Sequence, residues 1–479
     1  MDLLPLEIIQ KIFDFLPWKN QINFKLTCSQ YYHLRIVDLY FIPNKYLARL
    51  DGKVISQFPY LKYLNASQIN CHINNLSHLI ILNICNNKYI NDLNNLPHLT
   101  KLDISGPACG VDQYGIMNCT NLTSLNIGNN KKITNLSFFP HLRKLDISRH
   151  DCGVDNNGIL NCTNLTSLNA CDNTKIVDLN HLPNLIKLNV SGDCYVNDLG
   201  IVKCTNLTKL NTTHNHTITN LNHLPNLKIL CTNGFHSGIR NTSIKNCLHL
   251  LELHVSGNRK ISNLNHLRNL TTLNAGHESS VNNGGIKKCL KLTSLNISQG
   301  SNIKDINHLT NLTKLDISGG NITEHAIKKC KMIQELNISY NSNITNLNYL
   351  TNLKKLNAEH TKISENSLTY CYSITDLNIS HNNKIENLNH LINLRKLNIS
   401  DTRISDQGIR SCTKIVKLNI SQSYRIKNLD HLINLKKLIA RHYCQTNRKG
   451  EKTCWKPKII TKECKKLKYI DTKCINTMG

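Results

Sequence analysis

The sequence contains no apolar run long enough to cross a bilayer as a helix, which takes about 20 residues. Its first residues, Met1 to Glu7, carry neither the basic stretch nor the small-residue cleavage site of a secretory signal peptide. Both absences argue against a membrane protein or a secreted one. We therefore expect a soluble protein of the cytoplasm or nucleus, or of a host cell if the chain is viral, with no membrane partner.

Catalytic motifs are also missing. The sequence has no glycine-rich phosphate loop, no nucleophile elbow and no His-Glu-x-x-His zinc motif. Residues 441–479, which follow the last regular repeat described below, are too few to form a separate catalytic domain. The sequence therefore predicts a protein that is not an enzyme and that uses neither a cofactor nor a metal.

Acidic side chains are scarce. Asp and Glu total 31 against 58 Lys and Arg, which gives a formal net charge of +27. Such a charge favours an acidic partner over a basic one. The alternative is that AT-rich codons supply the lysine, together with the abundant Asn and Ile, and that the charge has no function.

What the sequence does contain is a repeat. The unit Leu-x-x-Leu-Asn-x occurs twice between Ile159 and Gly192, with its second leucine at Leu168 and Leu188. From Leu82 to Leu438 this leucine returns at steps of 20 residues that alternate with steps of 21 to 23. These lengths are typical of a leucine-rich repeat. The predicted fold class is an α/β solenoid, a curved array whose parallel strands lie on the concave face.

Each repeat should supply one short strand and a return segment. Alternation along the strand points Leu188 and Val190 into the core, and Lys187, Asn189 and Ser191 toward the concave surface. The Asn or Asp after the second leucine is expected to form an amide ladder between repeats. The return segment should bury Ile176, Leu179 and Leu182 on the convex side.

Most of the cysteines fit the repeat rather than a disulfide framework. Eight recur 41 to 43 residues apart: Cys119, Cys162, Cys204, Cys247, Cys289, Cys330, Cys371 and Cys412. Members two repeats apart lie about 9–10 Å from each other, whereas bonded cysteines have Cα atoms within about 7 Å. We expect reduced, buried thiols.

The same spacing argues against a metal site in a series of histidines, which should be structural on the convex side: His181, His223, His266, His308, His390 and His431. Near the end, Cys464, Leu467 and Ile470 restore the repeat once as a capping unit. Zinc bound by Cys444, Cys454, Cys464 and Cys474 remains an alternative.

The N-terminus has a different pattern. Pro5 suits the first turn of a helix and Pro17 ends it. Apolar side chains between them form one stripe at helical spacing. The pattern Leu4-Pro5-x-Glu7-Ile8-Ile9-x-x-Ile12-Phe13-x-x-Leu16, then Leu26-Thr27-Cys28-x-x-Tyr31, resembles an F-box. A plain helical cap over the first repeat is the alternative.

The resemblance implies a three-helix module that binds a Skp-type adaptor and, through it, a cullin. Ten residues would make the contact: Leu4, Pro5, Glu7, Ile8, Ile9, Ile12, Phe13, Leu16, Cys28 and Tyr31. The cysteine-containing repeats also look like those of F-box/leucine-rich-repeat receptors, the substrate-recognition subunits of cullin-type ubiquitin ligases. Asn- and Lys-rich members of this kind are similar to proteins of large DNA viruses and protists, in which case the adaptor would be a host protein.

The sequence thus divides into an F-box-like module over residues 1–45, a solenoid over 46–440, and a basic insertion with a capping repeat over 441–479. Candidate target contacts on the concave face are lysines of alternate repeats: Lys101, Lys144, Lys187, Lys314, Lys355, Lys396 and Lys437. Departures from the repeat consensus add Ile229, Cys231, Phe235, Glu252, His254, Arg441 and Tyr443. Neutral drift is the alternative explanation of these departures.

Two other functions stay open. One is a leucine-rich-repeat scaffold or regulator without a link to a ligase. The other is a basic solenoid that binds nucleic acid, which the scarcity of aromatic residues on the predicted strands disfavours, because single strands bind by stacking their bases on such residues.

Overall fold

The computed structural model describes residues 38–39, 60–69, 73, 76–446, 452–454, 461–472 and 474–476. The ten residues predicted to bind an adaptor, from Leu4 to Tyr31, lie outside this range, as does most of the predicted module over residues 1–45. The described part divides into two units. Unit 1 comprises Met1–Cys231 and His236–Ile239, and unit 2 comprises Thr232–Phe235 and Arg240–Gly479.

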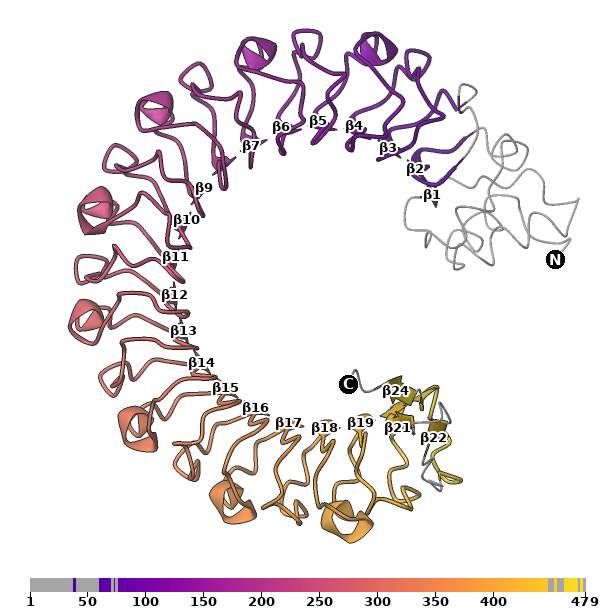
Figure 1. Cartoon of the computed structure of the whole chain (residues 1–479), viewed down its shortest axis with the longest axis vertical. Coiled ribbons are helices and arrows are strands. Elements are labelled where there is room, and N and C mark those ends of the chain that lie inside the picture. The colour runs from indigo at the N-terminus through magenta and orange to yellow at the C-terminus, as the bar shows by residue number, and fades with distance from the viewer. Residues whose placement is uncertain are drawn as a thin grey trace, which may run out of the picture. The chain divides into compact units, whose positions relative to one another are not determined.

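Unit 1 contains one ladder of short strands in chain order: β1 (Asp38–Leu39), β2 (Tyr63–Asn65), β3 (Ile81–Asn83), β4 (Lys101–Asp103), β5 (Ser124–Asn126), β6 (Lys144–Asp146), β7 (Ser167–Asn169), β8 (Lys187–Asn189), β9 (Lys209–Asn211) and β10 (Ile229–Cys231). Each pairs in parallel with the next; Ser167, for example, faces Lys187 across β7 and β8. The strands line the inner edge of the arc that unit 1 makes (Figure 1).

Unit 2 repeats this plan with β11 (Glu252–His254), β12 (Thr272–Asn274), β13 (Ser294–Asn296), β14 (Lys314–Asp316), β15 (Glu335–Asn337), β16 (Lys355–Asn357), β17 (Asp376–Asn378), β18 (Lys396–Asn398), β19 (Lys417–Asn419), β20 (Lys437–Ile439) and β23 (Tyr469–Asp471). A separate sheet follows, in which β21 (His442–Thr446) pairs with β22 (Lys452–Cys454) in antiparallel fashion and with β24 (Cys474–Asn476) in parallel.

The return segments correct the α/β class. The described residues contain no α-helix; alternate repeats instead carry a 3-10 turn on the outer edge: η2 (Tyr114–Ile116), η3 (Asn157–Ile159) and η4 (Leu199–Ile201) in unit 1, and η5 (Asn241–Ile244), η6 (Gly284–Ile286), η7 (Glu324–Ile327), η8 (Glu365–Leu368) and η9 (Asp406–Ile409) in unit 2. These are the longer repeats. Even these repeats of 21 to 23 residues are too short for a strand, an α-helix of typical length and two turns.

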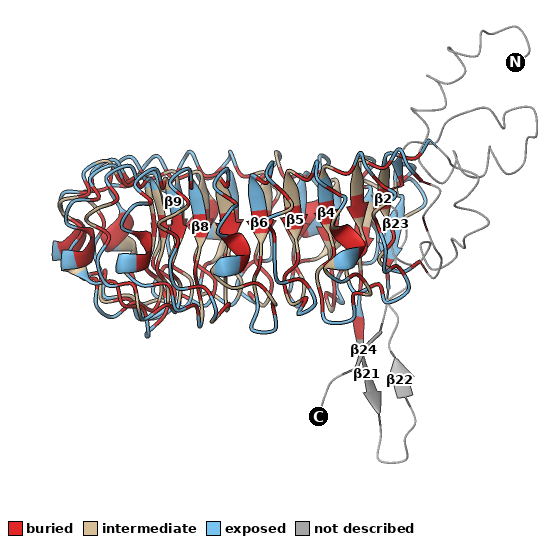
Figure 2. Cartoon of the chain, turned by 90° about the horizontal axis from the view of Figure 1, so that it is seen from above, coloured by how far each residue is buried: buried red, intermediate tan, exposed pale blue. Residues whose placement is uncertain are grey.

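The predicted core is confirmed. Leu188 is 3% exposed and Val190 is fully buried, as are Ile176, Leu179 and Leu182 on the return segment. Buried residues run through the interior of the turns in Figure 2. Burying such a side chain contributes about 1.5–3 kcal/mol, and the stack repeats this gain in every turn.

Ser191 was expected on the concave surface but is 8% exposed. Its hydroxyl donates to Asn189 Oδ1 at 2.7 Å. The amide ladder is present: Asn189 Nδ2 donates to Asn169 Oδ1 at 2.8 Å, and Asn169 Nδ2 donates to Asp146 Oδ2 at 2.7 Å.

A second ladder of asparagines lies inside the core. Asn173 is 1% exposed, and its Nδ2 donates to the carbonyl oxygens of Ile147 at 2.8 Å and Val154 at 3.3 Å. The same role recurs at Asn130, Asn215, Asn258, Asn341 and Asn382. These amides satisfy backbone carbonyls that the return segment would otherwise leave buried without a partner.

The cysteines and histidines of the repeat are structural. The eight cysteines of the repeat series form no disulfide, and the Cys204 thiol donates to Leu179 O at 3.4 Å. Burial raises the pKa of Cys204 to about 12 and that of Cys247 to about 11. In the histidine series, His266 Nε2 lies 3.1 Å from Ile244 O on the outer edge, and burial lowers the pKa of this imidazole.

The predicted capping repeat is also present, because β23 pairs in parallel with β20 and Leu438 faces Ile470. No further turn among the described residues pairs with β23, and Ile470 is 52% exposed. Cys464 belongs to the solenoid core, where its thiol donates to Leu429 O at 3.2 Å, whereas Cys444, Cys454 and Cys474 belong to the separate sheet. No helix among the described residues is long and apolar enough to span a membrane.

Candidate binding face

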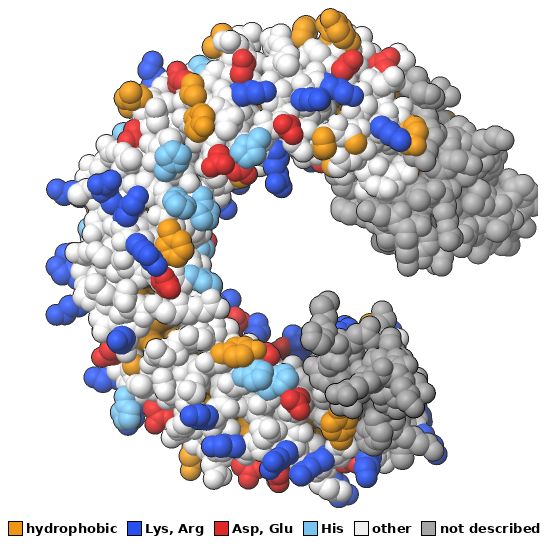
Figure 3. Space-filling model, in the orientation of Figure 1, with side chains coloured by type: hydrophobic (Ala, Val, Ile, Leu, Met, Phe, Trp, Pro, Cys, Tyr) orange, Lys and Arg blue, Asp and Glu red, His pale blue; other side chains and the backbone are white. Residues whose placement is uncertain are grey.

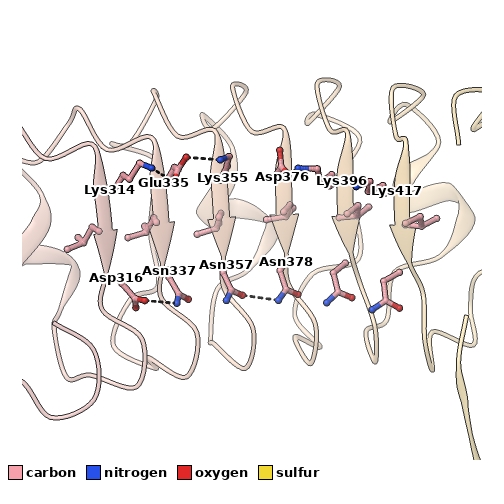
Figure 4. Close-up of a pocket in the computed structure, with 18 of the residues that line it drawn as sticks. Lys314, Asp316, Glu335, Asn337, Lys355, Asn357, Asp376, Asn378, Lys396 and Lys417 are labelled. Atoms are coloured by element: carbon pink, nitrogen blue, oxygen red, sulfur yellow. Dashed lines mark hydrogen bonds and ion pairs between the residues drawn. The ribbon is translucent and has the colours of Figure 1, made fainter. Parts of the chain in front are cut away.

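The inner face of each unit presents two rows of side chains. From β2 to β20, every strand of the ladder holds three residues, of which the middle one is buried. The first residues of successive strands form what we call the first row, and the third residues form the third row. Figure 4 shows both rows for part of unit 2, with Lys314, Glu335 and Lys355 in the first row and Asp316, Asn337 and Asn357 in the third.

Three first-row lysines of unit 2, Lys314, Lys355 and Lys396, pair with acids on the intervening strands. Glu335 accepts from Lys355 Nζ at 2.7 Å and lies 3.3 Å from Lys314 Nζ. The bond to Lys355 keeps the pKa of the Glu335 carboxyl below its usual range. Asp376 Oδ1 lies 2.6 Å from Lys396 Nζ. Exposed pairs of this kind contribute little stability, but they offset part of the positive charge of the row.

This pairing was not foreseen. Glu335 and Asp376 occupy the same strand position as the lysines on neighbouring repeats. The repeat pattern of the sequence could therefore have predicted these ion pairs. In parallel pairing Lys314 faces Glu335, and Glu335 faces Lys355.

A hollow of about 640 Å³ follows the inner face of unit 2, lined by the first and third rows from β13 to β20. Concave sites with a few convergent polar groups are the usual places for ligands. At its far end, Lys396, Lys417 and Lys437 stand on three adjacent strands. Lys437 Nζ lies 4.8 Å from the centre of the Tyr469 ring.

The inner face of unit 1 is built differently. Its first row holds Lys101, Lys144, Lys187 and Lys209, and the strands between the first three carry Ser124 and Ser167. Among the described residues, none of these four lysines forms an ion pair. Two acids of unit 1 sit in the third row, where Asp103 and Asp146 accept from the asparagines of the next strand.

The residues that depart from the repeat consensus lie at several separate places along the chain. In unit 1, Ile229 and Cys231 begin and end β10 and are half-buried. In unit 2, Glu252 Oε1 and His254 Nε2 lie 2.6 Å apart across β11.

Phe235, also in unit 2, lies under the Arg259 guanidinium at 4.5 Å, and Arg259 pairs with Glu278. These contacts give Phe235 local partners on the surface of unit 2. Its 49% exposure leaves it accessible to a partner as well.

Arg441 holds the last turn. Its Nε and Nη2 donate to Asp471 Oδ2 at 2.9 and 2.6 Å, and the Asp471 side chain is only 3% exposed. This gives Arg441 a structural partner in addition to the target contact predicted for it. The backbone of Tyr443 lies in β21, and its side chain is outside the described part.

Charge is mixed over the surface. Figure 3 shows Lys and Arg side chains interspersed with Asp and Glu on the visible face, not gathered in one patch. A continuous basic stripe is the usual electrostatic footprint of a nucleic-acid-binding protein. The distribution on this face does not match that footprint.

No protein-family model and no curated protein matches the chain. Solved structures do. TLR13 in its complex with ssRNA13 is 19% identical, covers 85% of this chain and 69% of its own, and has a TM-score of 0.56. Mouse RP105 in complex with MD-1 is 15% identical over 82% of this chain and 78% of that chain, with a TM-score of 0.55. A leucine-rich-repeat protein of Leptospira interrogans is 20% identical, covers 75% of this chain and 96% of its own, and has a TM-score of 0.47. The chain has the leucine-rich-repeat solenoid fold.

Proposed function

We propose that this protein is the substrate-recognition subunit of a cullin-type ubiquitin ligase. The solenoid binds an acidic protein target on its inner faces, and the F-box-like segment over residues 1–45 binds a Skp-type adaptor. Ubiquitin transfer is then the work of the partner subunits. This protein raises the effective concentration of the target near the conjugating enzyme.

The observation that supports target binding best is the open first row of unit 1. Lysines on alternate strands stand about 9–10 Å apart. An extended segment advances about 3.3 Å per residue, so an acidic residue at every third position of a target would meet successive lysines. The support for adaptor binding is the sequence motif from Leu4 to Tyr31.

The solved structures of this fold bind more than one kind of ligand: TLR13 was solved with single-stranded RNA, and RP105 with MD-1. A polyanion such as RNA would also meet the lysines of unit 1. However, Tyr63 and Tyr469 are the aromatic residues on the described strands of the two ladders, so base stacking has little support. We therefore propose an acidic protein target.

Capture of a purified Skp-type adaptor by the full-length chain tests the ligase half. The double variant Ile12→Asp with Phe13→Asp should lose capture, because it places two charges on the predicted apolar stripe. Gln10→Asp, on the predicted polar side of the same helix, is the matched control and should keep capture. Circular dichroism and the melting temperature should be unchanged in both. Full capture by the double variant would refute the F-box assignment.

Affinity purification from cells treated with a cullin inhibitor tests the target half. A target should accumulate with the wild-type chain and should be lost with Lys144→Glu plus Lys187→Glu. If the captured material were RNA, with affinity falling steeply as salt increases, the nucleic-acid function would replace the one proposed here.

A further inference from the structure

On unit 2, four neighbouring turns carry unusual side chains at the position three residues after the third-row residue. Tyr340, His360, His381 and Asp401 all have a left-handed backbone there, with φ between 51° and 60°. Equivalent turns elsewhere also have this left-handed backbone, at Asn129, Arg149, His214 and Gln299 for example; the four turns of unit 2 are singled out by the contacts among their side chains. We call Tyr340, His360, His381 and Asp401 the turn row.

The rings of the turn row stack. The Tyr340 and His360 centroids are 4.8 Å apart, and those of His360 and His381 are 4.1 Å apart with the planes within 5° of parallel. His360 is exposed, so the stack is not part of the core.

Glu359 completes a cluster of donor atoms. A carboxylate oxygen of Glu359 and one ring nitrogen each of His360 and His381 lie within 4.8 Å of one another. The carboxylate is anchored, because Asn378 Nδ2 donates to Glu359 Oε2 at 3.3 Å and the Tyr340 hydroxyl lies 3.5 Å from Oε1.

Asp401 orients His381. The Nδ1 atom of His381 lies 2.9 Å from Asp401 Oδ2, and an N–H donated there leaves Nε2 with a free lone pair. A histidine whose second nitrogen donates to a carboxylate is the common arrangement around protein-bound metals, because the hydrogen bond fixes the tautomer and raises the basicity of the ligating nitrogen.

The distances suit a small cation. Zinc binds imidazole nitrogen and carboxylate oxygen at about 2.0–2.2 Å in tetrahedral sites, which places two ligand atoms about 3.3–3.6 Å apart. Donors that lie within 4.8 Å of one another therefore need to close by up to about 1.5 Å. Because the lone pairs lie in the ring planes, the two parallel imidazoles also have to turn toward each other. Two imidazoles and a carboxylate are donors that select zinc, copper, nickel or cobalt over magnesium or calcium.

Competing groups on the described surface are weaker candidates. His150, Asp172 and Asp193 also cluster, but they offer one imidazole. Asp172 Oδ1 already accepts the backbone N–H of Asp193 at 3.1 Å, and its Oδ2 accepts the Cys171 thiol at 3.2 Å. The repeat cysteines bind poorly because burial raises their pKa to about 11 or 12, and only the thiolate binds metal.

We propose that Glu359, His360 and His381 bind one divalent transition-metal ion of the zinc class, with Asp401 as a positioning residue. The sequence predicted no metal site, because its argument concerned histidines two repeats apart, whereas His360 and His381 stand on adjacent turns. Three protein ligands leave a coordination position for water or for a side chain of a partner.

The test uses the full-length protein and zinc chloride alone, with the affinity measured by competition against a chromophoric chelator. His360→Asn and His381→Asn remove the imidazoles while keeping a residue that accepts the left-handed backbone. Each should weaken the binding of one zinc equivalent by at least about tenfold, and Asp401→Asn should weaken it about 10- to 100-fold. His214→Asn is the matched control: it stands at the same turn position in unit 1, is exposed and has φ 59°. It should leave zinc binding unchanged.

Cobalt supplies a second readout, because its absorption spectrum distinguishes nitrogen and oxygen ligands from thiolates. A spectrum free of a thiolate charge-transfer band, lost in His360→Asn, supports the site. Three results would overturn it: unchanged zinc affinity and stoichiometry in both histidine variants, a thiolate band in the wild type, or loss of the zinc equivalent in His150→Asn instead.

Discussion

The inner faces of units 1 and 2 place lysine at the same strand position and on alternate turns, yet the two rows differ in charge. In unit 2, Glu335 stands between Lys314 and Lys355 and pairs with both. In unit 1, the equivalent position between Lys144 and Lys187 is Ser167. The lysine period alone therefore does not define a basic surface; the residues on the intervening turns decide whether the lysines are available to a partner.

Core truncation should show that the difference is confined to the surface. Leu188 in unit 1 and Leu356 in unit 2 are buried equally, at 3% and 2% exposed. Leu188→Ala and Leu356→Ala should each reduce the free energy of unfolding by about 2–5 kcal/mol, measured by urea denaturation. A loss below 1 kcal/mol in either variant would mean that its turn is not part of a packed core.

Reversing the charge of paired lysines should affect peptide binding more on the inner face of unit 1 than on that of unit 2. Lys144→Glu with Lys187→Glu should weaken the binding of a fluorescent poly-glutamate peptide by at least about tenfold, because exposed charge contacts contribute up to about 1 kcal/mol each and reversal adds repulsion. Lys314→Glu with Lys355→Glu is the matched variant in unit 2. It should weaken binding less, since Glu335 already pairs with both lysines and offsets part of their charge; equal losses would contradict the comparison.

Exchanging the first-row residue between two lysines should make the charge of one inner face more like that of the other. Ser167→Glu places a carboxylate between Lys144 and Lys187 and should weaken peptide binding about two- to fivefold, at a coupling of up to about 1 kcal/mol. Glu335→Gln releases Lys314 and Lys355 and should strengthen it by a similar factor. Fluorescence anisotropy at low ionic strength measures both. Changes of the same sign in the two variants would exclude the pairing as the cause.

Residues whose role repeats were predictable from the sequence. Leu188 and Cys204 return at fixed intervals, and burial follows from the period. The buried Asn173 ladder also repeats but was overlooked, because asparagine is so abundant that its periodic members do not stand out. The 3-10 turns could not be predicted from the repeat length. In so short a return segment, the spacing of the apolar residues fits an α-helix and a 3-10 helix equally well.

The candidate site was less predictable than the core. The lysines were found because they repeat, but the ion pairs depend on which strands become neighbours and on side-chain length. The His360–His381 stack requires two left-handed turns that lie side by side, and a left-handed backbone at a histidine has no clear sequence signature. The separate sheet of β21, β22 and β24 breaks the repeat, so periodicity gave no information about it.

The smallest effect is expected from the histidines on the outer edge, which occur in both units. Burial is the main cause of a lowered pKa at His181 and His223 in unit 1 and at His266, His390 and His431 in unit 2. The unfolded chain, whose imidazoles keep a pKa near 6.5, therefore takes up protons first as the pH falls. The contribution of these histidines to stability is complete above about pH 6.5 and is lost progressively below it.

The melting temperature should fall as the pH is lowered from 7.5 to 5, and His181→Gln or His266→Gln should each remove part of that fall. Because the histidines occupy the same outer-edge position in both units, the two variants should act alike; a clear difference between them would show that the contrast between units 1 and 2 extends beyond the inner faces.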